Sequence, residues 1–381
     1  MKIGIDARII FRRGVGRYIS NLVKALLEID KKNSYFIYLD KKSMLVDYIN
    51  AKNCVFRRIN TSNAFMYEQF FLPAAAKKDK VDILHGTDNT IPVFFRGKTA
   101  VTIHDTMFIR PISRTILKPT MKQRVTDAYN KSAIPASAKK ADRVITVSEY
   151  SRQDILKNIK IGGDKVRVIG EGVEEKYKVI KNEKRIKKVK EKFGIIKPYI
   201  MISAASDLRK NTIRAIEAFN IFNNLTEYKY QLVITSIGAK ELATTNIRRK
   251  ISELNLEKYV IITDYVTDED MVLLYNGGFC LLFPSIWEGF GLQVLEAFAC
   301  GLPVITSDNT SLKETAGDAA FFIDPFSVED IVRGMTSLAS APARRRSMVS
   351  KGFKQLKNFS WKEAAKETLK VYEEAVNNTN D

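Results

Sequence analysis

The sequence predicts an α/β protein built from two doubly wound domains, each with a parallel sheet. Short apolar, β-branched runs alternate with stretches in which apolar residues recur at helical spacing. This alternation occurs twice along the chain, and 381 residues exceed what one hydrophobic core usually organises. Strands that alternate with helices form parallel sheets of right-handed βαβ units, so two series indicate two such domains.

The first series begins with a strand at 2–7 and a helix at 17–29. Ser148 marks the start of a later helix, because a serine hydroxyl can cap free N–H groups. We place the first domain at residues 1–178. Its further strands are expected at 35–39, 81–86, 99–105, 141–148 and 166–172.

The second series begins with a strand at 197–204, and we place the second domain at residues 195–360. An amphipathic stretch that begins at Ser360 predicts a C-terminal helix at about 361–381, which we expect to pack back on the first domain. Helices are expected at 211–223 and 291–299. The remaining strands are expected at 230–236, 259–266, 279–285, 303–308 and 319–325.

Composition excludes several classes of protein. Cys54, Cys280 and Cys300 cannot form a disulfide framework, and we expect three buried thiols in a reducing cytosol. Only two histidines, His85 and His104, are present, which argues against a His-based zinc site. No apolar stretch reaches the roughly 18 residues of a bilayer span, so we expect a soluble protein, at most peripheral to a membrane.

The positive charge is concentrated in the first half of the chain. Residues 1–200 hold 42 Lys and Arg against 20 Asp and Glu, whereas residues 201–381 hold 20 against 23. A solvated basic surface, an anionic membrane and a nucleic acid all fit this imbalance. The nucleic acid ranks last, because no nucleic-acid-binding motif accompanies the charge.

Two segments bear on the membrane alternative. Residues 107–123 mix apolar side chains with Lys and Arg, which is typical of an interfacial loop or helix but also of a half-buried loop. Residues 176–193 are rich in Lys and Arg and lack Gly and Pro. We interpret them as a linker into a solvated helix, with a lipid-facing helix as the alternative.

Both histidines lie at the carboxyl ends of predicted strands, His85 in 81–86 and His104 in 99–105. Ligands of doubly wound sheets bind beyond the carboxyl ends of the strands, at the point where the strand order reverses. With two such domains, the cleft between them is the expected site. His104 is the stronger functional candidate and His85 the weaker, with a structural role open for each.

The first glycine loop, RRGVGRY at 12–18, connects a strand to a helix. Gly14 and Gly16 would let backbone approach a ligand at the helix N-terminus. A dinucleotide fingerprint would need a third glycine where Ile19 stands, so this interpretation is weak, and a simple tight turn remains open.

Arg209 and Lys210 are adjacent cations at a strand-to-helix junction, where Asn211 or Thr212 could cap the helix. A helix N-terminus prefers anions, so two cations there are poorly placed unless an anionic ligand such as a diphosphate binds. A plain exposed loop is the alternative.

The segment 284–308 carries the strongest signal. A strand ends at about 283, and a loop with Gly289 leads into a helix. The free N–H groups at Phe290, Gly291 and Leu292 can hold anions or hydroxyls. Two carboxylates, Glu288 and Glu296, flank this site and could accept hydrogen bonds from sugar and ribose hydroxyls.

This segment, with two glutamates eight positions apart around GFG and then EAFACGLPVI, resembles the signature of glycosyltransferase family 4. The resemblance covers nearly the whole chain and implies a retaining, metal-independent, nucleotide-sugar-dependent transferase of the GT-B fold. The other similar segments are GIDAR, GVGRYISNL, IHDTMFIRP, VITVSEYSRQDI, VRVIGEGV, LRKNT, LLFPS and FSWKEAAKETLKVY.

The resemblance implies roles for residues of the second domain. Glu288 would lie near the transferred sugar, Glu296 would hold the ribose hydroxyls, and the amides of 289–292 would face the sugar and diphosphate. Arg209 and Lys210 would neutralise the diphosphate. Many relatives have Gly-Arg where this chain has Ser203 and Ala204, so one cation of the pattern is absent and the role of Arg209 is less certain than that of Lys210.

The resemblance also implies roles for two residues of the first domain. His104 would lie beside the sugar, and Gly16 would allow the first helix to approach the phosphate. Metal-dependent transferases use an Asp-x-Asp at a strand end. Here the acids at 268–270 follow Thr267 and read as the first turn of a helix, where they offset the dipole. We therefore expect no metal and no cofactor, with the nucleoside-diphosphate sugar as donor substrate.

The expected protein is a cytoplasmic glycosyltransferase, peripheral at most on the inner membrane face. It would move a hexosyl group, mannosyl from GDP-mannose as first choice, to a lipid-linked or polysaccharide acceptor in cell-surface glycan synthesis. The alternatives are a catalytically silent nucleotide-sugar-binding protein and a basic nucleic-acid-binding protein.

Overall fold

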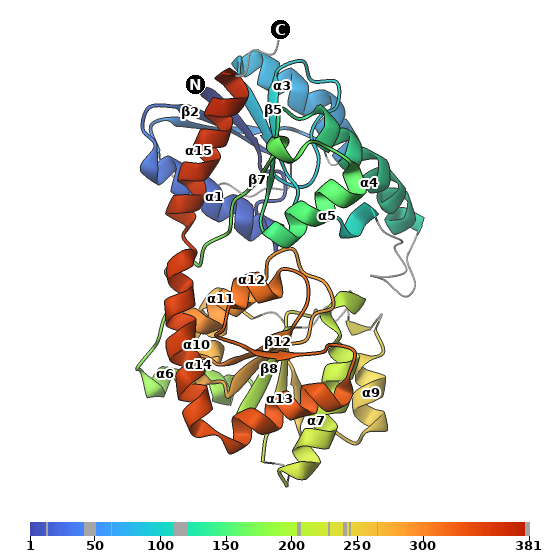
Figure 1. Cartoon of the computed structure of the whole chain (residues 1–381), viewed down its shortest axis with the longest axis vertical. Coiled ribbons are helices and arrows are strands. Elements are labelled where there is room, and N and C mark those ends of the chain that lie inside the picture. The colour runs from blue at the N-terminus through green and yellow to red at the C-terminus, as the bar shows by residue number, and fades with distance from the viewer. Residues whose placement is uncertain are drawn as a thin grey trace. The chain divides into compact units, whose positions relative to one another are not determined.

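The structure is a computed structural model (Figure 1) that describes residues 1–377 except 13, 42–50, 62, 110–120, 204–206, 228, 239–241, 244 and 265. The chain forms two compact units. The first contains Met1–Arg110, Thr120–Gly172 and Ser360–Asp381, and the second contains Val173–Phe359. Among the helices of the described residues, none is long and apolar enough to cross a membrane. The predicted interfacial segment at 107–123 lies mostly outside the described residues.

The first unit is built on a seven-stranded, fully parallel sheet. The strand order reverses beside β1, which pairs with β2 on one side and with β4 on the other. In spatial order, the strands are β3 (Cys54–Arg58), β2 (Ser34–Leu39), β1 (Lys2–Asp6), β4 (Ile83–Gly86), β5 (Lys98–Thr102), β6 (Arg143–Thr146) and β7 (Val166–Val168).

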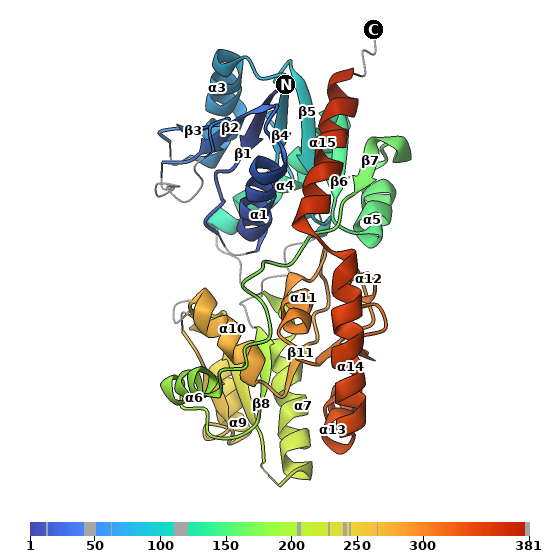
Figure 2. The ribbon, with the colours of Figure 1, turned by 90° about the vertical axis from the view of Figure 1, so that its left-hand side faces the viewer.

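Helices of the first unit include one from the far end of the sequence. In Figures 1 and 2, α15 (Trp361–Asn377) lies beside α1 (Val15–Ile29), as the C-terminal stretch predicts. The helix at 64–79 has a π-helical middle. The remaining helices are α2 (Ala64–Met66), the π-helix η1 (Tyr67–Phe71), α3 (Leu72–Asp79), η2 (Met107–Ile109), α4 (Met121–Lys140), α5 (Glu149–Ile159) and η4 (Gly163–Lys165).

The second unit repeats the design with a six-stranded parallel sheet. Its order reverses beside β8, which pairs with β9 and with β11. In spatial order, the strands are β10 (Val260–Ile262), β9 (Gln231–Thr235), β8 (Tyr199–Ser203), β11 (Cys280–Phe283), β12 (Val304–Ser307) and β13 (Phe321–Ile323).

The helices of the second unit follow the strands in turn, so both units have the predicted doubly wound α/β architecture. The helix expected at 211–223 is α7 (Thr212–Leu225), and the one expected at 291–299 is α11 (Leu292–Ala299). The others are α6 (Glu183–Lys192), η5 (Leu208–Lys210), α9 (Ile247–Glu253), α10 (Asp268–Gly277), α12 (Leu312–Ala316), α13 (Val328–Ser340), α14 (Pro342–Gln355) and η6 (Leu356–Asn358).

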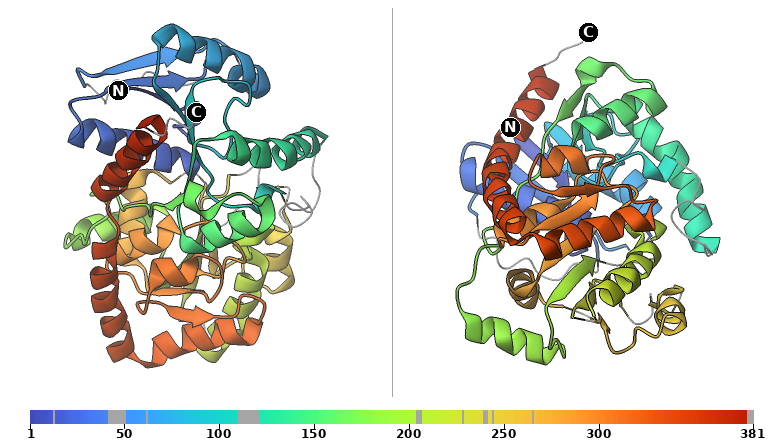
Figure 3. Two further views of the ribbon diagram at one scale, coloured as in Figure 1. Left: turned by 45° about the horizontal axis from the view of Figure 1, so that its top comes forward. Right: turned by 60° about the horizontal axis from the view of Figure 1, so that its bottom comes forward.

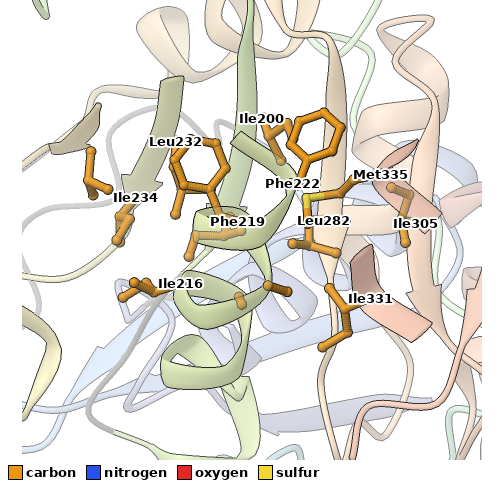
Figure 4. Close-up of a cluster of buried hydrophobic side chains, with 14 of the residues drawn as sticks. Ile200, Ile216, Phe219, Phe222, Leu232, Ile234, Leu282, Ile305, Ile331 and Met335 are labelled. Carbon is orange, nitrogen blue, oxygen red and sulfur yellow. The ribbon is translucent and has the colours of Figure 1, made fainter. Parts of the chain in front are cut away.

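The core of the second unit lies between its sheet and helices α7 and α13 (Figure 4). Ile216, Phe219 and Phe222 recur on one face of α7 and are fully buried against Leu232 and Leu282 of the sheet. Burying a side chain of this size contributes about 1.5–3 kcal/mol, so this cluster holds the strand ends in register. That register fixes the loops at the carboxyl edge.

The cysteine prediction is partly wrong. Cys280 and Cys300 are buried thiols, but Cys54 is only half-buried, because it lies on β3 at the edge of the first sheet. Burial raises the pKa of Cys54 and of Cys300 to about 12, so both thiols stay protonated near neutral pH.

Candidate active site

In the second unit, the predicted site residues gather at the carboxyl ends of β8 and β11. Lys210 ends η5, which lies between β8 and α7, and Glu288 lies in the loop after β11. The Lys210 Nζ donates a hydrogen bond of 2.8 Å to Glu288 Oε1, and it lies 4.7 Å from the ring centroid of Phe283. Sequence positions 78 residues apart thus form one ion pair at the point where the strand order reverses.

This ion pair is mostly shielded from solvent. The side chains of Lys210 and Glu288 are 17% and 15% exposed. Burial raises the pKa of Glu288, but the charges of Lys210 and Arg209 and the hydrogen bond from Lys210 outweigh it, so the pKa lies below its usual range. Glu288 is therefore a carboxylate that can accept hydrogen bonds at neutral pH.

Arg209 lies beside Lys210 but has a different carboxylate partner. Its Nε is 2.6 Å from Asp207 Oδ2, and Asp207 Oδ1 accepts a hydrogen bond from the Arg209 backbone N–H at 3.0 Å. The carbonyl of Arg209 accepts from the N–H of Ile286 in the loop after β11. Two cations and two carboxylates therefore share the strand ends, and the loop that carries Glu288 is attached to η5 through its backbone.

Asn211 does not cap α7 with its side chain, which corrects the capping prediction. Its backbone is left-handed, with φ of 56°, and its buried side-chain amide donates to the carbonyls of Pro284 at 3.1 Å and Pro325 at 2.6 Å. These carbonyls follow β11 and β13. Asn211 thus ties three strand ends together, a role that the sequence pattern did not reveal.

The loop after β11 delivers the N-terminus of α11 to the same edge. Gly291 precedes the helix with φ of 103°, and a Cβ there would lie 2.8 Å from Leu312 Cδ2. The buried Phe290 packs edge-on against Phe359 with centroids 5.6 Å apart, and its carbonyl accepts from Thr315. The N–H groups of Phe290, Gly291 and Leu292 lie at the start of α11, before the first helical hydrogen bond, which runs from the Val294 N–H to the Gly291 carbonyl. They can therefore donate to an anion or a hydroxyl.

Glu296 lies inside α11, more than a turn from its start, and is 2% exposed. Its Oε2 accepts a hydrogen bond of 3.2 Å from the hydroxyl of Tyr275 on α10. At the helix start, Gln293 donates to the Ser203 hydroxyl at 2.8 Å. A neutral amide–hydroxyl contact thus occupies the end of β8, and Ala204 lies outside the described residues.

In the first unit, His104 follows β5 and is nearly buried. Its Nε2–H donates to the carbonyl of Thr87 at 3.0 Å, and its backbone N–H donates to Asn89 Oδ1 at 2.9 Å. The ring packs edge-on against Tyr18, and Nδ1 lies 3.9 Å from Glu171 Oε1. Burial lowers the pKa of His104, opposed by Asp88, the Thr87 carbonyl and Asp105.

The two glycines of the first loop differ in what they do. Gly14 has φ of 70° and no atom within 4 Å of the position of a Cβ, so its backbone conformation is what requires glycine. A Cβ on Gly16 would lie 2.5 Å from the Ile9 carbonyl oxygen. At Gly16, the missing side chain lets α1 pack against the chain's own loop.

His85 has a structural environment. It is fully buried, and its ring nitrogens form hydrogen bonds with the hydroxyls of Tyr372 at 2.7 Å and Thr102 at 2.8 Å. Thr102 shares a further hydrogen bond of 2.9 Å with Tyr18. Burial foremost, and then the charge of His104, lowers the pKa of His85 to about 3, so it is neutral at physiological pH.

A buried ionic cluster lies at the carboxyl end of β1, and it was not predicted from the sequence. Arg8 pairs with Glu68 at 2.5 Å and with Asp6 at 3.3 Å, and Glu68 also accepts from Thr90 at 2.7 Å and Tyr129 at 2.6 Å. The available signal was Asp6 and Arg8 directly after the first strand, but Glu68 comes from a distant helix. The cluster lies at the point where the strand order of the sheet reverses, beside β1.

The acids at 268–270 form the first turn of α10, as predicted, with Thr267 as the cap. Each pairs with a cation of the segment 176–193: Asp268 with Lys176, Glu269 with Arg185 and Asp270 with Lys192. Most of α6 is exposed, as expected for a solvated helix. The described part of the chain holds no cluster of three or more His, Cys, Asp or Glu residues that could bind a metal.

Comparisons with known proteins agree with this architecture. Residues 12–177 match the family model Glycosyltransferase Family 4, and residues 180–355 match Glycosyl transferases group 1. The chain is 28% identical over 302 residues to O-antigen chain mannosyltransferase B of Escherichia coli, which covers 78% of this chain and 76% of that protein. It is 28% identical over 269 residues to serotype-specific mannosyltransferase WbdA of E. coli, covering 70% of this chain but only 32% of WbdA. The Anabaena protein HepE, solved in complex with UDP and glucose, superposes with a TM-score of 0.77 at 15% identity, covering 98% of this chain and 99% of HepE.

Proposed function

The chain belongs to the glycosyltransferases of the family 4 and group 1 models and has their GT-B fold, and from this premise we propose a donor, an acceptor and a set of catalytic residues. The donor is a nucleoside-diphosphate hexose, with GDP-mannose as first choice. The acceptor is a growing lipid-linked glycan or polysaccharide, met at the inner membrane face. Transfer retains the anomeric configuration and uses no metal ion.

The observation that carries the proposal is the Lys210–Glu288 pair beside the start of α11. The carboxylate of Glu288 balances the ammonium of Lys210. A bound diphosphate would bring additional negative charge to Lys210, to Arg209 and to the backbone N–H groups of Phe290, Gly291 and Leu292. Fixed donors of this kind stabilise developing charge without reorganisation, by about 3–4 kcal/mol for a well-placed donor.

In the proposed step, the bond between the anomeric carbon and the diphosphate oxygen breaks, and its electron pair leaves with the diphosphate. The acceptor hydroxyl oxygen bonds to the anomeric carbon on the same face, and its proton passes to the departing diphosphate. Glu288 would accept hydrogen bonds from the hydroxyls of the sugar, and Glu296 would accept them from the hydroxyls of the ribose. His104 of the first unit would lie beside the sugar. Gly14 and Gly16 shape the loop before α1 for the phosphate.

The mannosyl preference rests on the two E. coli relatives, both of which are described as mannosyltransferases. Their names also refer to O-antigen chains and serotype, which supports a polysaccharide acceptor in cell-surface glycan synthesis. HepE was solved with UDP, so the base of the nucleotide is the part of the donor that needs a direct comparison.

The first experiment measures donor binding by thermal shift with GDP, UDP, ADP and their hexose derivatives, with and without EDTA. A ligand at about 100 times its Kd adds about 2.7 kcal/mol of stability. We expect GDP and GDP-mannose to raise the melting temperature most, with no effect of EDTA. Binding to none of these nucleotides would refute the proposal.

The second experiment replaces Lys210 with Met and Glu288 with Gln. We expect each variant to lose about 100–1,000-fold in transfer rate, because a preorganised contact to the reacting groups is removed. Lys351→Met is the matched control, because Lys351 forms an exposed pair with Asp318 and should transfer as the wild type does. A protein that binds donor but shows equal, negligible turnover in all variants would be the catalytically silent alternative.

A further inference from the structure

The helix at 64–79 presents four large apolar side chains to solvent. Phe65, Met66, Phe70 and Phe71 are between 37% and 57% exposed, although aromatic residues are usually covered. On the inner side of the same helix, Glu68 is 2% exposed and held by the buried cluster around Arg8. The helix is thus anchored by an ion pair and turned with its aromatic face outward.

The π-helical turn explains this arrangement. In η1, the N–H of Leu72 donates to the carbonyl of Tyr67, five residues earlier, so this turn is wider than an α-helical turn and brings side chains five positions apart closer together. Phe65 and Phe70, five positions apart, therefore pack edge to face with centroids 6.1 Å apart. An ordinary α-helical turn would separate them.

Two further segments extend this surface. Tyr129 on α4 packs edge-on against Phe65 at 5.8 Å, and Met121 and Val125 precede it at four-residue intervals on the same face of α4. In both views of Figure 3, the N-terminal part of α4, drawn in teal, extends beyond the sheet of the first unit. The backbone N–H of Val93 donates to Gln69 at 3.1 Å, which brings the neighbouring Phe94 to the helix at 64–79.

We call the following exposed side chains the apolar patch: Phe65, Met66, Phe70, Phe71, Phe94, Met121 and Val125. Phe94 is 86% exposed and Met121 76% exposed.

The three segments around the apolar patch, 63–80, 92–98 and 121–131, carry eight Lys and Arg but only three acids. Two of these cations are paired with carboxylates, Lys131 with Asp127 at 2.7 Å and Lys98 with Asp142 at 3.3 Å. The other two acids, Glu68 and Asp79, are buried in ion pairs with Arg8 and Arg57, which lie outside these segments. The three segments therefore keep an excess of positive charge. Arg96 and Arg124 are among the exposed cations beside the apolar side chains.

We propose that the apolar patch and its surrounding cations dock the first unit onto the surface of an anionic lipid bilayer. Aromatic and aliphatic side chains would enter the boundary between headgroups and acyl chains, and Lys and Arg would meet the lipid phosphates. The inference deepens the proposed function, on which it rests only for the lipid-linked acceptor that such a surface would present.

Charge decides between a bilayer and a second copy of the chain as the occupant. Two copies joined through this face would bring two sets of uncompensated cations together, which opposes association. An anionic bilayer supplies both the apolar layer and the opposite charge. A neutral partner surface would leave the excess cations without a counterpart.

The test is co-sedimentation of the full chain with vesicles of phosphatidylcholine alone or with 30% phosphatidylglycerol. We expect strong preference for the anionic vesicles. Replacing both Arg96 and Arg124 with Gln should weaken binding to the anionic vesicles about 30-fold. Each surface cation contributes about 1 kcal/mol to membrane binding, which corresponds to about fivefold in affinity. Replacing Phe70, Phe94 and Val125 with Ser should also weaken binding at least tenfold.

The matched control replaces Ile196 and Leu225 with Ser in the second unit, since these side chains are 82% and 66% exposed. It should bind vesicles as the wild type does. Equal binding to both vesicle types, equal loss in the control, or a lipid-free dimer that the Ser variants abolish would each overturn the proposal. Because the assay contains no nucleotide, its outcome is independent of donor binding measured by thermal shift.

Discussion

The chain of hydrogen bonds through His85 shows how a buried polar residue can stabilise a fold while remaining uncharged. Its two ring nitrogens reach the hydroxyls of Thr102 and Tyr372, and Thr102 extends the chain to Tyr18. A neutral imidazole can donate at one nitrogen and accept at the other, so it matches two hydroxyls. A protonated imidazole would donate twice and would be charged in an apolar interior.

This environment predicts a pH dependence of stability. The pKa of His85 falls from 6.5 in the unfolded chain to about 3 in the fold, so between these values only the unfolded state takes up the proton. His85 therefore lowers the free energy of unfolding by about 1.4 kcal/mol for each pH unit below 6.5. Urea unfolding of the wild type and of His85→Asn from pH 4.5 to 7.5 measures this slope.

The wild type should lose stability more steeply with acid than His85→Asn, although the variant is less stable at neutral pH. Parallel slopes would contradict the prediction. The two imidazole signals in an NMR titration provide a second readout, because the one that persists in His104→Gln belongs to His85. That signal should not titrate above pH 5.

From the sequence alone, His85 and His104 look alike, since each lies at the carboxyl end of a predicted strand. What separates them is contributed by distant segments: Tyr372 of α15 closes over His85, whereas Glu171 approaches His104. The proximity of Lys210 and Glu288 was more predictable, because both follow strands of one parallel sheet. The buried partner of Arg8 was not, because Glu68 depends on how a helix packs.

At the scale of elements, the start of α11 depends on one glycine. Replacing Gly291 with Ala introduces a Cβ at a φ of 103° and 2.8 Å from Leu312 Cδ2. We expect a destabilisation of about 1–3 kcal/mol and a displaced N-terminus of α11. Thermal denaturation measures the loss of stability, and nucleotide thermal shifts measure the loss of the amide site.

Gly194→Ala is the matched control for Gly291→Ala. Gly194 also has a positive φ, of 70°, but no atom lies within 4 Å of the position of a Cβ. The control should lose about 1 kcal/mol for the backbone conformation and leave nucleotide binding unchanged. Equal effects of the two substitutions on nucleotide binding would show that the contact with Leu312 is irrelevant to the site.

Burial decides which strands can be predicted from the sequence. A central strand such as β11, with the sequence CLLF, is buried on both faces and forms a continuous apolar run. β3 lies at the sheet edge, with mostly exposed or half-buried residues, and its sequence CVFRR carries no such run. The helix at 64–79 changes its period at the π turn, and α4 contains Pro135 and few buried apolar positions, so neither shows a regular helical pattern.

At the scale of the whole molecule, the first unit is completed by a helix that follows the second unit in sequence. Glu374 of α15 pairs with Arg143 and Arg167 at 3.1 Å each, and Tyr372 is fully buried against His85. A Cβ on Gly172 would lie 2.3 Å from the Trp361 backbone nitrogen, so the two places where the chain changes units are packed together.

Deleting the chain from Ser360 onward should therefore destabilise the first unit selectively. The deletion uncovers apolar residues of α1 and removes the hydrogen-bond partner of His85. Hydrogen exchange followed by mass spectrometry should show faster exchange in β1, β4 and β5, with protection retained in β8 and β11. Uniform loss of protection in both sheets would contradict this prediction.

The same connectivity constrains how the protein forms on the ribosome. Domains usually fold in the order in which they emerge, at about 5–20 residues per second. Here the sheet at the start of the chain must wait for Trp361–Asn377, which are translated only after Val173–Phe359. The interval is about 10–40 s. During that time, the surface of the first unit that α15 later covers is exposed to solvent and accessible to chaperones. The second unit, although it is translated later, can complete its folding before the first.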